Sequence, residues 1–239
     1  MARPTAEALA LAISLLVTDA DVTDTLTRVL RECVTQLGAQ AAGLLVRDEA
    51  GELEMLSATS HAVAELEIFQ IQNDAGPCVD TIRTGALVVA GDPHAVARRW
   101  PGAVAEAIES AGYRATHAAP LRWQDHVLGA VNVFYREPRR PGDDDAGLLQ
   151  AFADITCLAI LQAPSLTRDE VTARLRHALH GRTLVEHAKG VIAYQRGVDM
   201  ATAYASLLDA AAGGRAISAV AIDVVAGAQR SPGEGVMLP

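Results

Sequence analysis

The chain has almost no lysine. One lysine, Lys189, stands among nineteen arginines in 239 residues. It lies in the segment EHAKGVI, in the middle of a predicted helix. Aromatic residues are also scarce at 4%, so the core has to be built mainly from Ala, Val, Leu and Ile. Such cores suit helices and a mixed sheet.

Cysteines and long apolar runs are few as well. Cys33, Cys78 and Cys157 are far apart and odd in number, which argues against a disulfide framework and against a metal site. No run approaches the roughly 18 consecutive apolar residues that a membrane helix needs. The short apolar run at residues 8–17 lacks a signal-peptide cleavage pattern. We therefore expect a cytoplasmic, reduced protein without a membrane segment.

The net charge of −9 argues against nucleic acid as a partner of the whole chain. Its distribution changes that conclusion. Residues 1–164 carry 12 basic and 22 acidic side chains, whereas residues 165–230 carry 8 basic and 6 acidic ones. An acidic module followed by a mildly basic one indicates two domains with different partners.

Hydrophobic periodicity and turn residues predict the secondary structure. The first 163 residues read as helices and strands in mixed order, and Pro164 then breaks the chain. This order predicts an α+β domain over residues 5–163, an antiparallel sheet flanked by helices. An all-α three-helix domain is predicted over 165–230, and 231–239 is expected to be a flexible tail. The expected helices are two within 5–37, then 62–72, 79–84, 103–111, 143–163, 167–195, 200–212 and 216–228; the expected strands are 42–46, 53–58, 86–90, 114–121 and 127–135.

Three cations recur every seven residues on the first C-terminal helix. Arg182, Lys189 and Arg196 are expected to project along one line about 21 Å long. Such a line suits successive phosphates of a folded RNA loop. The alternative is a solvated face, in which Glu186 pairs with Arg182 or Lys189. Periodicity alone favours the solvated face.

The segment ALHGRTLVEHAKGVIAYQRGVDMATAYASL resembles the ANTAR domain of transcription antitermination regulators. That family has an A-L-x-x-R pattern, then A-K-G before an aliphatic residue, a short loop and an A-[FY] helix. The pattern falls here on Ala178, Leu179, Arg182, Ala188, Lys189, Gly190, Val191, Ala203 and Tyr204. The resemblance covers about 60 residues. It implies a three-helix bundle that binds paired stem-loops in nascent RNA and so prevents a terminator hairpin from forming.

The resemblance implies roles for individual residues. Arg182 and Lys189 would contact phosphates or base edges, with Arg196 further along the same line. Gly190 would allow RNA or a neighbouring helix to approach closely, and Tyr204 would either stack on a loop base or pack in the core. The chain departs from the family between Leu208 and Arg215, where a basic residue and an Asn are usual.

The first domain resembles a GAF domain of the type fused to actinobacterial ANTAR regulators. The residues that carry this resemblance are AGPCVDTIRTGALVVAGD and the later segment with P-L and G-x-x-N-V, Gly129–Val133. Cys78 is the one thiol on a loop beside a helix start, where it would be a ligand-binding residue or a packing residue. No histidine shows metal-ligand spacing, and no nucleophile with a base is apparent. We expect no resident cofactor and no enzyme activity.

The sequence thus predicts a signal-responsive, RNA-binding regulator that acts by antitermination. Two stem-loops need two readers, so we expect a homodimer, with a small molecule as its effector. The alternative is a small-molecule or redox sensor whose C-terminal bundle binds a protein and has lost RNA binding. The altered region from Leu208 to Arg215 favours that alternative.

Overall fold

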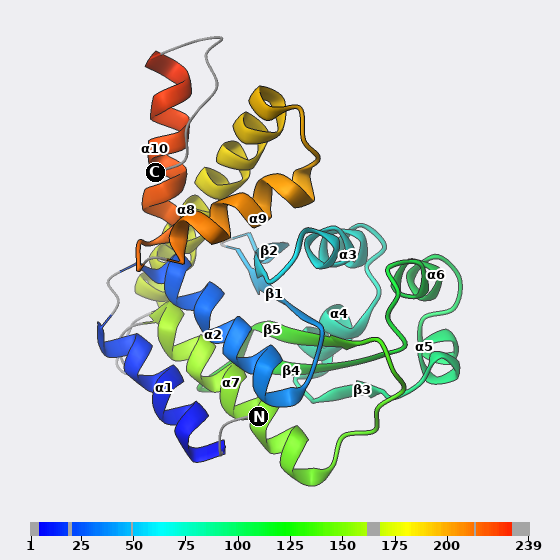
Figure 1. The fold of residues 1–239 in the computed structure, drawn as a ribbon. Coiled ribbons are helices and arrows are strands. Elements are labelled where there is room, and N and C mark those ends of the chain that lie inside the picture. Colours follow the sequence, from blue (N-terminus) through cyan, green and yellow to red (C-terminus); the bar gives the residue numbers. More distant parts are fainter. Residues whose placement is uncertain (1–4, 19–20, 49, 162–167, 213, 231–239) are drawn as a thin grey trace.

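A computed structural model describes residues 5–18, 21–48, 50–161, 168–212 and 214–230 of the chain. It contains a sheet between two layers of helices, with a helical bundle at one end (Figure 1). We call residues 5–161 the N-terminal domain and residues 168–230 the C-terminal bundle. Pro164 and the predicted tail, 231–239, lie outside the described residues.

The N-terminal domain contains the helices α1 (Thr5–Thr18), α2 (Val22–Leu37), α3 (His61–Gln72), α4 (Pro77–Thr84), α5 (Pro93–Arg99), α6 (Ala103–Ser110) and α7 (Asp143–Leu161). Its strands are β1 (Ala41–Arg47), β2 (Leu53–Ala58), β3 (Val88–Ala90), β4 (Ala115–Trp123) and β5 (His126–Tyr135). The C-terminal bundle contains α8 (Arg168–Arg196), α9 (Met200–Ala211) and α10 (Ile217–Arg230).

The five strands form one sheet in the order β2-β1-β5-β4-β3, and every neighbouring pair is antiparallel. The predicted α+β class and antiparallel sheet are therefore confirmed. The long strands β4 and β5 form a hairpin, and β1 pairs with β5 so that Gly43 lies opposite Asn132. This pairing places β1 between β2 and the central strand β5, where both of its faces are buried along most of its length.

The two faces of the sheet carry separate cores. Helices α1, α2 and α7 cover one face, with Leu26, Val131 and Phe152 among the buried side chains. Helices α3, α4, α5 and α6 lie on the other, around Leu45, Ile82 and Phe134 (Figure 1). Apolar residues alternate along the strands between the two cores, which is why the sheet is covered on both sides.

The C-terminal bundle has its own core of small aliphatic residues. Ala188, Ile192, Leu207 and Val220 are all buried between its three helices. Helix α8 ends at Gly197, whose φ of 65° suits glycine, and Asp199 then caps α9 by accepting a hydrogen bond from the Thr202 amide at 2.7 Å. The bundle rests on α2, β2 and α3 of the N-terminal domain (Figure 1).

One helix was not predicted. Helix α5 begins after Asp92, whose side chain accepts from the Ala95 amide at 2.8 Å, with Pro93 in the first turn. Asp followed by Pro is a helix-start signal that the sequence offered. The helix is only seven residues long, so its hydrophobic period is too short to detect.

Candidate functional site

The three predicted cations of α8 do not form an open line in this structure. Arg196 is exposed and Arg182 is half-buried, but Lys189 is only 2% exposed. A lysine is almost never fully buried unless it is paired. The expectation of a solvated face is therefore wrong for Lys189, because the N-terminal domain covers this part of the helix.

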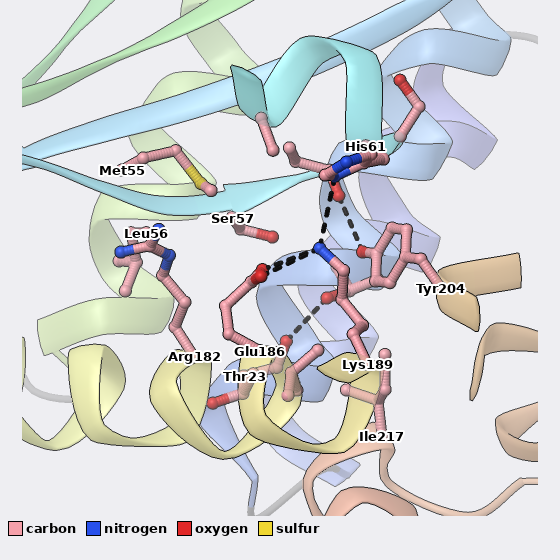
Figure 2. A pocket seen from close by; sticks show the side chains of 15 residues that line it. Thr23, Met55, Leu56, Ser57, His61, Arg182, Glu186, Lys189, Tyr204 and Ile217 are labelled. Carbon is pink, nitrogen blue, oxygen red and sulfur yellow. Dashed lines mark hydrogen bonds and ion pairs between the residues drawn. The ribbon is translucent and has the colours of Figure 1, made fainter. Parts of the chain in front are cut away.

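The Lys189 ammonium lies in a ring of partners from both domains (Figure 2). It donates to both carboxylate oxygens of Glu186, at 3.0 and 2.9 Å. Its Nζ also lies 3.4 Å from Nδ1 of His61, at the start of α3, and 5.1 Å from the centre of the Tyr204 ring. Because the ammonium can only donate, this contact requires Nδ1 of His61 to be unprotonated.

Tyr204 joins α9 to the sheet. Its hydroxyl donates a hydrogen bond of 2.8 Å to the carbonyl of Ala58, at the end of β2. Burial raises the pKa of Tyr204 to about 12, so the hydroxyl keeps its proton and remains a donor. In this conformation the ring is partly buried, with the Lys189 ammonium beside it and the hydroxyl bound to the N-terminal domain.

Arg182 is the residue of this group with an unused donor. Its Nε is buried and has no hydrogen-bond partner among the described residues. The side chain lines a cavity between the two domains, together with Ser57, His61, Glu186 and Lys189 (Figure 2). The cavity volume of about 30 Å³ suits about two water molecules. It is too small for a nucleotide.

Gly190 lies on the outer side of α8. It is exposed, and a methyl group added there would meet no described atom within 4 Å. No neighbouring helix approaches it, so packing within the part of the chain that the structure describes does not explain this glycine. The surface at Gly190 remains open to a partner.

The altered region before α10 is held within the bundle. Leu208 packs against the bundle core. Arg215, the basic residue of this region, forms an ion pair with Asp223 of α10. Its charge is thus already balanced in this conformation.

Cys78 belongs to a buried polar cluster between the sheet and the helices α3 and α4. Its thiol donates to the carbonyl of Ala130 at 3.8 Å, and its amide donates to Oε1 of Gln70 at 3.1 Å. Burial raises the pKa of the Cys78 thiol well above its ordinary value, and the neighbouring Glu67 adds to the shift. This position favours the thiol over the reactive thiolate.

Glu67 is the centre of that cluster, and sequence reasoning missed it. It is fully buried, and it accepts hydrogen bonds from Gln70 at 2.9 Å and from Asn132 at 3.2 Å. Burial raises the pKa of Glu67 to about 7, against the opposing effect of its hydrogen bonds with Cys78, Asn132 and Gln70. Gly43 makes room for it, since a Cβ there would lie 2.6 Å from the Glu67 side chain. The helical register offered a signal, because Val63, Glu67 and Gln70 share one face of α3.

The described residues contain neither a metal cluster nor a membrane span. No group of three or more His, Cys, Asp or Glu residues among them is placed to hold a metal ion. None of the helices described is long and apolar enough to cross a membrane.

Two family models match successive parts of the chain. A family model described as GAF domain matches residues 19–160, and one described as ANTAR domain matches residues 173–225. No protein of curated function matches the chain in sequence.

Several solved structures are similar to the N-terminal domain. One is the GAF domain of a phosphoenolpyruvate-protein phosphotransferase from Acinetobacter, with 12% identity, a TM-score of 0.53, and coverage of 70% of this chain and 99% of that one. The corresponding domain from Coxiella burnetii has 14% identity, a TM-score of 0.52 and coverage of 66% and 94%. A phycoerythrobilin-bound GAF domain from a cyanobacterial phytochrome has 15% identity, a TM-score of 0.52 and coverage of 68% and 96%. At these identities the likeness shows the fold alone.

Proposed function

This chain belongs to the GAF domain family and continues into an ANTAR domain, and from that architecture we propose that it is a signal-responsive regulator that binds RNA. The C-terminal bundle binds stem-loops in nascent transcripts and acts by transcription antitermination. The N-terminal domain receives the signal, a small-molecule effector, and the active form is a homodimer in which each bundle reads one stem-loop.

The observation that carries the proposal is the ANTAR match over residues 173–225. It includes Arg182, Lys189, Gly190, Arg196 and Tyr204, the residues assigned to RNA from the sequence. Two features of the structure support it. The Nε of Arg182 is an unused donor, and the exposed Gly190 has no packing role within the described residues. Gly190 suits a surface that a phosphate backbone approaches, and the Arg182 donor becomes available to a phosphate once the cavity between the domains opens.

RNA binding by the purified chain tests the proposal. We expect binding to an RNA with two tandem hexanucleotide-loop hairpins, measured by fluorescence anisotropy at low and at physiological salt. Binding should weaken at the higher salt, because cations displace counterions from phosphates. Lys189→Ala and Arg196→Ala should each weaken it. Arg114→Ala is the matched control, since it removes an exposed cation from the N-terminal domain, far along the chain from the bundle.

Two results would contradict the proposal. One is the absence of RNA binding at low salt, both by the wild type and by a variant in which Lys189 is exposed to solvent. The other is an affinity that neither substitution on α8 changes. Either result would favour the second candidate, a sensor whose bundle binds a protein. The specific observation on its side is the Arg215–Asp223 ion pair, which occupies the one cation of the altered region.

A further inference from the structure

Two of the five residues assigned to RNA are occupied by contacts with the N-terminal domain. Lys189 reaches His61 at the start of α3, and Tyr204 donates to the carbonyl of Ala58 at the end of β2 (Figure 2). A third residue, Arg182, lines the cavity between the two domains. We call the surface of the N-terminal domain formed by Ala58 and His61 the docking surface. While the bundle rests on it, Lys189 is only 2% exposed and the Tyr204 hydroxyl is occupied, so RNA cannot use either group.

We infer that the docking surface competes with RNA for the same face of the C-terminal bundle, so that the chain reads RNA only after the bundle leaves this surface. This inference rests on the proposed function and adds its regulation. It assigns the described conformation to the resting state. The signal received by the N-terminal domain would then act by weakening the docking.

The contacts that hold the bundle in place are suited to reversible docking. Besides the pairs already named, the amide of Ile217 donates to Oδ1 of Asp24 at 3.3 Å, and the Ser218 hydroxyl donates to the Asp21 carboxylate. These contacts are polar, and each group can exchange its partner for water or phosphate. The first half of α8 is anchored separately, because Leu175 and Ala178 are buried in the apolar core of the N-terminal domain, so undocking concerns the part of the bundle that follows. Domain interfaces of this kind resemble transient protein interfaces, for which relative motion is the default expectation.

Charge supports the competition. Residues 1–164 carry 22 acidic against 12 basic side chains, so a strongly acidic body lies against the only net basic module of the chain. The net negative charge of that domain repels phosphate from the docked bundle. Once the bundle has left, Lys189 keeps Glu186 as a neighbour on its own helix but loses the contribution of His61.

The contact between α2 and α8 provides a way to force the two domains apart. A Cβ added at Gly181 would lie 2.0 Å from Oγ1 of Thr23 and 3.2 Å from its Cβ. Gly181→Ala and Gly181→Leu should therefore displace α8 from the N-terminal domain. Both substitutions raise helix propensity, so the bundle itself should fold at least as well. Leu adds a bulk that rotation of the Thr23 side chain cannot relieve.

The test measures two properties of these variants. The first is the rate at which an amine-reactive reagent labels the ε-amine of Lys189, followed by peptide mass spectrometry and compared with the rate in denaturant. Because the chain has one lysine, this label reports on one side chain. The second is affinity for the tandem hairpin RNA. Gly147→Ala and Gly147→Leu are matched controls, because a Cβ at this helical position meets no described atom within 4 Å.

We expect slow labelling in the wild type and in the Gly147 variants. Gly181→Leu should label Lys189 about tenfold faster and bind RNA about tenfold more tightly, since the apparent affinity scales with the fraction of competent molecules. This lies within the roughly 5- to 150-fold range of natural allosteric couplings. Thr23→Ala combined with Gly181→Ala removes the closest clashing atom and should return both values toward the wild type. Bound RNA should slow the labelling of Gly181→Leu.

Each other outcome overturns the inference at a different step. Fast labelling of the wild type, or equal labelling of wild type and Gly181→Leu, would show that the docking surface does not cover Lys189. Faster labelling with an unchanged RNA affinity would show that docking and RNA do not compete. Faster labelling with no RNA binding by any variant would refute the proposed function, and with it the competition.

Discussion

The buried carboxyl of Glu67 should make the stability of the N-terminal domain depend on pH. Burial in the protein raises its pKa to about 7, from an ordinary value of 4.5. The folded state therefore binds this proton more tightly than the unfolded state does. The resulting stabilisation is complete below pH 4.5 and is lost as the pH rises through 7.

The size of the effect follows from that difference of about 2.5 pH units. Each pH unit corresponds to about 1.4 kcal/mol, so the free energy of unfolding should fall by about 3 kcal/mol between pH 5 and pH 8 on account of Glu67. In Glu67→Gln the side chain is neutral at every pH. At pH 5 the free energy of unfolding of the variant should lie between that of the wild type and a value about 3 kcal/mol lower. The loss arises because the amide cannot reproduce both hydrogen bonds.

The quantity to compare is the stability difference between Glu67→Gln and the wild type at the two pH values. Any loss of stability caused by the amide is the same at both pH values. The stability of the variant relative to the wild type should therefore rise by about 3 kcal/mol from pH 5 to pH 8. Denaturant unfolding followed by tryptophan fluorescence measures it, since Trp100 and Trp123 both lie in the N-terminal domain. Glu109→Gln, an exposed position on α6, controls for the loss of a carboxylate. A difference that stays constant within about 0.5 kcal/mol would refute a neutral, buried Glu67.

Three further predictions concern the remaining site residues. Native Cys78 should resist iodoacetamide at pH 8 and react after unfolding, and rapid native labelling would show an open thiolate. Tyr204→Phe keeps the ring but removes the hydrogen bond to Ala58, and it should weaken docking by about 1 kcal/mol. The weaker docking should appear as faster labelling of Lys189, and unchanged labelling would show that this bond does not hold the bundle. Arg182, Lys189 and Arg196 are each expected to neutralise one phosphate, so a plot of the logarithm of RNA affinity against the logarithm of salt concentration should have a slope of about −2. Arg196→Ala should reduce the magnitude of that slope by about 0.7. A slope near zero would exclude phosphate contacts.

The fold could be predicted because it follows from local periodicity. The strands β4 and β5 are runs rich in apolar residues joined by a tight turn, and α2 carries a buried stripe that ends at Gly38, whose φ is 60°. The resemblance to a GAF domain followed by an ANTAR domain is confirmed by the family matches over 19–160 and 173–225. The helix α5 was missed because seven residues give a period no room to repeat.

The polar interior could have been predicted only in part. Glu67 and Gln70 fall on the same face of α3 as Val63, so their burial follows from the register. Their partners do not. Asn132 reaches Glu67 because β5 pairs with β1 at Gly43, a tertiary arrangement that no local pattern specifies. Likewise the seven-residue period places Lys189 on the side of α8 that carries Arg182, but a period does not say whether another domain covers that side.

The docked conformation gives a physical reason for a lysine, in place of an arginine, at position 189. An ammonium is compact and donates in three directions, whereas a guanidinium is a wide, planar fork. At Lys189 the donor has to meet the Glu186 carboxylate, Nδ1 of His61 at 3.4 Å and the face of the Tyr204 ring at 5.1 Å. These partners lie around a point, not along a plane, and the neighbouring cavity holds only about 30 Å³. Under the proposed function Lys189 serves both the docking surface and RNA, so its side chain is constrained twice. The compact set of partners distinguishes position 189 from Arg182, which is assigned to RNA and lines the cavity too but leaves its Nε without a partner among the described residues.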